Sequence, residues 1–75
     1  MDLNELRTAV EYQAARESVF RSEQALRWYM RRHRAKLVAA GAIVIVNRSP
    51  LVVPARFDAA VLDIGADLAR GAVAA

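Results

Sequence analysis

Residues 41–54, GAIVIVNRSPLVVP, decide the fold of this chain. Residues 42–46 and 51–53 are apolar, mostly β-branched and of strand length, so both runs favour extended structure. The residues between them, 47–50, read NRSP and are typical of a turn. We therefore predict a two-stranded hairpin. Pro50 implies an edge position, because it cannot donate a hydrogen bond to a strand ladder.

A hairpin of this size is marginal alone and must pack on helices. Gly41 is the expected end of a preceding helix, and Pro54 is the expected first residue of the last one. Apolar residues follow Pro54 at helical spacing: Phe57, Val61, Ile64 and Leu68. Gly65 lies within this pattern as a candidate break, and residues 71–75 are expected to form a frayed tail.

Two helices are predicted before the hairpin. The first spans residues 2 to about 17, with Asp2 as N-cap and an apolar stripe of Leu3, Leu6, Val10 and Ala14. The second follows the N-cap Ser22, and residues 36–40 either continue it or form a separate short helix. Its apolar face carries Leu26, Met30, His33 and Leu37.

These elements predict one domain over residues 1–75. The fold class is mainly α with a small β-hairpin (α+β), in the order helix, helix, hairpin, helix. We expect Phe57 in the core, and Tyr12, Tyr29 and Trp28 as packing residues, the tyrosines with wet hydroxyls.

Positive charge is concentrated in the middle of the chain. The net charge is +3, but residues 21–56 contain eight Lys and Arg and one acidic residue, Glu23. The flanking segments contain three basic and seven acidic residues. Seven of the eight central basic residues are Arg, whose planar guanidinium suits phosphates and base edges. This distribution predicts one electropositive face that attracts nucleic acid.

Composition argues against several other functions. The chain has no Cys and one His, so thiolate chemistry is excluded and a His-ligated metal site is not expected. It lacks phosphate-binding glycine loops and paired catalytic residues, so we expect neither an enzyme nor a cofactor. The apolar run 37–46 is too short to cross a bilayer, and the first residues lack a basic signal-peptide region. We therefore expect a soluble, cytoplasmic protein, nucleoid-associated if bacterial.

Three stretches carry a family resemblance. Residues 22–27 (SEQALR) look like the start of the recognition helix in excisionase-like and MerR-like winged helix-turn-helix proteins. Residues 41–48 (GAIVIVNR) resemble the entry into their wing, and residues 52–57 (VVPARF) resemble the second wing strand and the following helix start. The distance from Ser22 to Gly41 is similar to that in phage- and plasmid-borne members. This resemblance covers roughly residues 20–62.

On the DNA hypothesis, each candidate residue has an expected role. Ser22 and the first-turn amides would hold a phosphate, while Gln24, Arg27 and Arg31 would face the major groove. The remaining candidates would contact the DNA backbone or, at the hairpin tip, the minor groove: Arg21, Arg32, Arg34, Lys36 and Arg48. The alternatives are an ordinary N-cap for Ser22, a solvated helix face for the helical residues and a polar turn for Arg48.

The sequence thus predicts a sequence-specific duplex-DNA-binding protein, either a transcriptional regulator or a recombination and excision accessory factor. We expect it to act as a homodimer or cooperative array, with a recombinase or polymerase as a further partner. The alternative is a helical interaction or dimerisation module without DNA affinity. RNA binding is a third hypothesis, but Trp28 is the one candidate for stacking on exposed bases.

Overall fold

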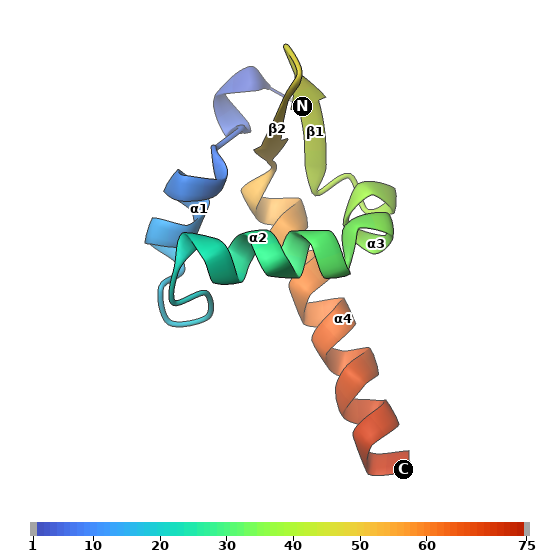
Figure 1. Cartoon of the computed structure of the whole chain (residues 1–75). Helices are drawn as coiled ribbons and strands as arrows, with labels where there is room; N and C mark the ends of the chain where they lie inside the picture. Colours follow the sequence, from blue (N-terminus) through green and yellow to red (C-terminus); the bar gives the residue numbers. More distant parts are fainter. Residues whose placement is uncertain (1, 75) are drawn as a thin grey trace.

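Four α-helices and one hairpin form the chain in a computed structural model that describes residues 2–74 (Figure 1). In order they are a 3₁₀ turn η1 (Leu3–Glu5), α1 (Ala9–Ala15), α2 (Glu23–Arg32), α3 (Arg34–Ala39), β1 (Ile43–Val46), β2 (Ser49–Val52) and α4 (Pro54–Ala74). The mostly helical class with an antiparallel hairpin is confirmed. The order contains one helix more than predicted before the hairpin.

The predicted single helix over residues 2–17 is wrong. Asp2 caps only the 3₁₀ turn, and Thr8 starts α1 through a second capping box, in which its side chain accepts from the Glu11 amide and Glu11 accepts from the Thr8 amide. Between the 3₁₀ turn and Thr8 the backbone is extended, and Arg7 pairs with Val52 through hydrogen bonds of 2.9 and 2.8 Å. The expected apolar stripe is therefore wrong as well, because Leu3 and Val10 are exposed while Ala9 and Tyr12 are buried.

The helix after Ser22 ends at Arg32, and α3 is separate. The backbone leaves helical geometry at His33, with φ −113° and ψ 24°. This break resolves the open question about residues 36–40, since α3 runs from Arg34 to Ala39. Leu26 of α2 and Leu37 of α3 are both fully buried, so the two helices share one core.

Gly41 ends α3, as predicted. Its φ of +71° is a left-handed conformation that favours glycine. The Gly41 amide donates to Val38 and the Ala42 amide donates to Leu37, which is the Schellman pattern. This motif directs the chain from α3 into β1.

The predicted hairpin is confirmed, but β1 begins one residue later than expected, and β2 begins two residues earlier and ends one residue earlier. Asn47 and Arg48 form a two-residue turn, and Val46 pairs with Ser49. Ile45 pairs with Pro50. Hydrogen-bonded and non-hydrogen-bonded pairs alternate along an antiparallel ladder, and Ile45 and Pro50 form a non-hydrogen-bonded pair. The missing Pro50 donor therefore faces away from β1 and costs no ladder hydrogen bond.

The last helix begins at Pro54, as predicted, but Gly65 does not divide it. The helix continues through residues 71–74, and Ala75, the last residue of the expected frayed tail, lies outside the described residues. Phe57, Ala60 and Ile64 are buried, whereas Leu68 is 61% exposed. In Figure 1 the C-terminal half of α4 extends away from the other elements.

Aromatic rings join α1, α2 and α4 in the core. The Phe57 ring lies 4.7 Å from that of Tyr12 and 6.3 Å from that of Phe20, measured between centroids. The Tyr29 ring of α2 packs against Phe20 at 5.2 Å. Phe57 is thus a core residue, as expected. Trp28 is 56% exposed, so its expected packing role is wrong.

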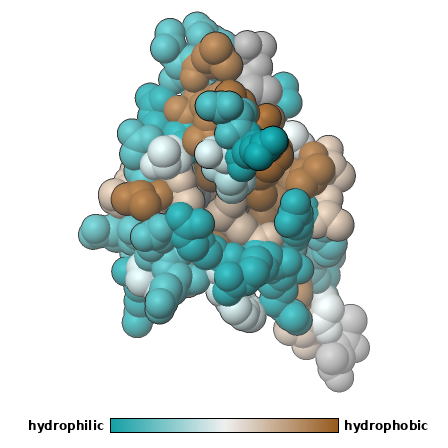
Figure 2. Space-filling view, turned by 45° about the horizontal axis from the view of Figure 1, so that its top comes forward, coloured by the Kyte–Doolittle hydropathy of each residue, from teal (hydrophilic) through white to brown (hydrophobic). Residues whose placement is uncertain are grey.

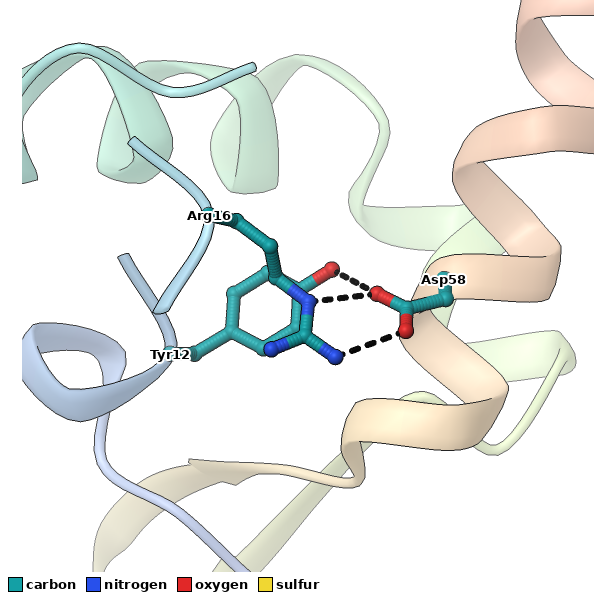
Figure 3. A network of polar contacts seen from close by, with 3 residues as sticks. All are labelled: Tyr12, Arg16 and Asp58. Carbon is teal, nitrogen blue, oxygen red and sulfur yellow. Dashed lines mark hydrogen bonds and ion pairs between the residues drawn. The ribbon is translucent and has the colours of Figure 1, made fainter. Parts of the chain in front are cut away.

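A polar cluster lies beside these rings (Figure 3). The Tyr12 hydroxyl donates to Asp58 at 2.6 Å, and the Arg16 guanidinium donates to both Asp58 oxygens at 2.8 and 2.7 Å. Burial raises the pKa of Tyr12, so its hydroxyl remains a donor. The hydrogen bonds from Arg16 hold the pKa of Asp58 below its ordinary value. Asp58 therefore links α1 and the following turn to α4.

We predict that Asp58→Asn lowers stability by about 1 kcal/mol at pH 7, a modest value because Arg16 and Asp58 are partly exposed. The folded-state pKa is lowered, so the stabilisation is complete above the ordinary aspartate pKa of about 4 and is lost as pH falls through the lower value. Urea unfolding should therefore show a difference from wild type at pH 7 that disappears at strongly acidic pH. Asp63→Asn, at an exposed carboxylate on the same helix, is the matched control. A difference that persists unchanged in acid would contradict this role.

Candidate nucleic-acid interface

A groove between α2, α3 and the hairpin brings four of the predicted arginines together. Its volume is about 520 Å³. Arg27 and Arg31 come from α2, Arg34 from the start of α3 and Arg48 from the hairpin tip. All four side chains are exposed, and together they surround one concave surface with positive charge.

Apolar side chains complete the groove between these arginines: Met30, Val38, Ile43, Ile45 and Pro50. Val38 is 52% exposed and Ile45 is 61% exposed, which is high for large apolar residues. Figure 2, which brings the hairpin end forward, shows hydrophobic surface near the middle of this face with hydrophilic side chains around it. A surface of this composition suits a ligand with both anionic and apolar parts, such as a sugar–phosphate strand with its bases.

The sequence did not identify this apolar part. Met30 was assigned to the core-facing stripe, yet it is only half-buried and also lines the groove. Residues 43–46 are β-branched at every position, so alternation of polar and apolar residues could not show which strand face is covered. The exposure of Ile45 becomes visible only when the hairpin is placed beside α2.

The four arginines differ in their local pairing. Arg27 contacts Glu23 one turn earlier on α2, with Nε donating at 2.8 Å and a second guanidinium nitrogen at 2.6 Å. Arg31, Arg34 and Arg48 form no ion pair within residues 2–74. Glu23 therefore neutralises one side of the groove, whereas the other three guanidinium groups remain available to an anion.

Arg48 occupies an unusual backbone conformation. Asn47 and Arg48 have φ values of 52° and 67°, the pattern of a type I′ turn. Asparagine tolerates this conformation well, but the second position normally carries glycine, because a Cβ there is unfavourable. The turn is therefore locally strained at Arg48, and it places the Arg48 guanidinium at the end of the groove.

The other predicted residues lie outside the groove. Ser22 is the N-cap of α2, and its hydroxyl accepts from the Ala25 amide at 3.1 Å, so the capping role is confirmed. The guanidinium carbon of Arg32 lies 5.8 Å from the centre of the Trp28 ring. Arg21, Gln24 and Lys36 do not line the groove. Four of the nine residues predicted to bind DNA therefore line the groove, and the other five lie outside it.

Other kinds of site receive no support from the described residues. Within residues 2–74, no cluster of three or more His, Asp or Glu could hold a metal ion. The helices in the same range include none long and apolar enough to cross a membrane. Partly buried His33 lies with its ring 4.6 Å from that of Tyr29, in agreement with its predicted place on the apolar face.

Comparisons with known protein families, with curated proteins and with solved structures find no significant match.

We predict that Arg48→Gly stabilises the isolated protein by about 0.5–1 kcal/mol, because glycine relieves the positive φ. Thermal or urea unfolding measures this change. Arg48→Lys is the matched control, since it retains a Cβ and a positive charge and should give no gain. A glycine variant no more stable than wild type would contradict the presence of strain at this turn.

Proposed function

We propose that this protein binds double-stranded DNA through the groove between α2, α3 and the hairpin. The observation that carries the proposal is the convergence of Arg27, Arg31, Arg34 and Arg48 from three separate elements on one concave surface. Clustered guanidinium groups bind phosphates through bidentate hydrogen bonds and release condensed counterions. On this proposal the protein is a transcriptional regulator or an accessory factor in recombination and excision.

The arrangement of elements supports a winged helix-turn-helix interpretation. On this interpretation α1, the turn at residues 16–22 and α2 form the helix-turn-helix unit, and α2 is the recognition helix. The hairpin is the wing, with Arg48 at its tip. An α-helix fits the major groove of B-form DNA, where Arg side chains read guanine.

Positions outside the groove fit complementary roles. The exposed start of α2, with Ser22 and Arg21, offers backbone amides and positive charge to a phosphate. Gln24 lies one turn before Trp28 on α2, and on this proposal it contacts a base edge. Arg32 and Lys36 add exposed positive charge that steers the duplex without reading its sequence.

Duplex DNA accounts for this surface better than RNA. Sequence-specific RNA recognition relies on aromatic side chains that stack on splayed bases, and the major groove of A-form RNA is too narrow for a helix. Among the described residues, Trp28 is the only exposed aromatic side chain. The Arg32 guanidinium already lies over its ring.

We predict that Arg31→Ala and Arg34→Ala each weaken binding to duplex DNA and each lower the salt dependence of binding by about one unit of log–log slope. Each variant removes one cation that has no ion pair among the described residues. Fluorescence anisotropy with labelled duplexes at several salt concentrations measures both quantities.

Arg70→Ala is the matched control, because it removes an exposed Arg from α4, away from the groove. It should leave the DNA affinity nearly unchanged. Equal losses for all three variants would indicate a nonspecific polycation. Failure to enrich any sequence from a random duplex pool would contradict the regulator function, and complete absence of DNA affinity would favour the interaction-module alternative.

A further inference from the structure

The part of α4 after Ala60 is amphipathic, and residues 2–53 leave most of its apolar side exposed, although Val61 is partly buried against the core. At 3.6 residues per turn, its charged residues Asp63, Asp67 and Arg70 lie on one side. The other side carries an apolar strip, which we define as Val61, Leu62, Gly65, Leu68, Ala69 and Ala72. Leu62 is 73% exposed and Leu68 is 61% exposed. A helix with separated apolar and charged sides normally buries the apolar one.

The apolar strip continues into a hollow between α1, the following turn and α4. This hollow has a volume of about 350 Å³, and its walls include Tyr12, Val19, Phe20 and Leu62. Its polar groups are already satisfied, because the Asp58 carboxylate accepts hydrogen bonds from Tyr12 and Arg16. The space that remains is bordered by apolar surface, and Val19 is 59% exposed there.

Four positions of the apolar strip lie symmetrically about Gly65. Leu62 lies three residues before Gly65 and Leu68 three residues after it, while Val61 and Ala69 lie four residues away on either side. An interface across a two-fold axis requires this property, because residue i must meet residue j while j meets i. In an antiparallel pair of α4 helices with the axis at Gly65, Leu62 of each copy faces Leu68 of the other.

We infer that a second copy of this chain docks on the apolar strip, with its α4 antiparallel and centred on Gly65. Leu68 of the second copy then lies next to Leu62 and enters the hollow formed with Val19 and Phe20. The charged residues Asp63, Asp67 and Arg70 stay on the solvent side of both helices.

Gly65 is the residue that permits this close approach. Glycine inside a helix is less favourable than alanine. A Cβ at Gly65 would meet nothing within 4 Å in the isolated chain, so packing inside the chain does not require glycine. At the crossing point of two helices, the missing Cβ lets the backbones approach.

The inferred pair leaves the arginine groove free. The groove is lined by residues of α2, α3 and the hairpin, whereas the strip and hollow belong to α1, its following turn and α4, and the two sets share no residue. A two-fold pair would therefore present two grooves, which suits a palindromic DNA site. The association itself does not depend on DNA and is testable without it.

Sedimentation equilibrium of the full chain, without DNA, tests this inference. Leu68→Asp and Leu62→Lys should each raise the dimer dissociation constant at least about tenfold, because each buries one unpaired charge per interface half. The double variant Leu62→Lys/Leu68→Asp should recover much of the dimer, since the introduced lysine of one copy then faces the introduced aspartate of the other. Only an antiparallel register brings these positions together, because they lie six residues apart within one helix.

Ala66→Asp is the matched control, with the same charge change at an exposed position of α4 outside the apolar strip. It should leave the dimer intact, and circular dichroism should show that every variant remains folded. A wild-type chain that is monomeric at all concentrations would overturn the inference. A dimer insensitive to Leu68→Asp would also overturn it, and a double variant no better than the single ones would exclude the antiparallel register.

Discussion

The contacts of Phe57 and Asp58, neighbours in the first turns of α4, hold the rest of the structure in place. Phe57 is fully buried and packs on the rings of Tyr12 and Phe20, while Asp58 accepts hydrogen bonds from Tyr12 and Arg16. Val53 alone separates β2 from α4. Its amide donates to the carbonyl oxygen of Ala42, the residue before β1. The same short stretch therefore fixes α1 and α2 on one side and the hairpin on the other. The groove exists because these two groups of elements cannot move independently.

Within residues 2–74, polar side chains are fully hydrogen-bonded inside the fold, whereas three of the groove arginines have no ion pair. Inside the fold, pairing is complete: no buried side-chain nitrogen or oxygen among the described residues lacks a hydrogen-bond partner. At the groove, Arg31, Arg34 and Arg48 lack ion pairs within the same residues, and Arg48 occupies a strained backbone conformation. Mutual repulsion and strain oppose folding, so their presence around one concavity is better explained by a ligand than by stability.

Local chemistry in the sequence accounts for much of the fold. The glycine after α3, the turn residues and the proline that begins α4 define the hairpin and its neighbours from short-range signals alone. The first helix was mispredicted because the Thr8–Glu11 capping box was overlooked in favour of the cap at Asp2. The candidate site was predicted in part, because helical spacing places Gln24, Arg27, Arg31 and Arg34 on one face. Three of these four line the groove, although Gln24 does not and Arg34 belongs to the separate helix α3. The apolar groove lining and the Asp58 contacts join residues that are distant in sequence. The spacing of apolar residues along the chain cannot show which distant residues come into contact.

An NMR titration of isotope-labelled protein with a short DNA duplex tests directly whether the arginine groove binds DNA. The largest chemical-shift changes are expected in α2, at Arg34 and around the Asn47–Arg48 turn. Resonances from the exposed apolar strip of α4 should change little when the protein concentration is held constant. Changes concentrated on α4, or no changes with any duplex, would contradict the assignment of the arginine groove as the DNA-binding surface.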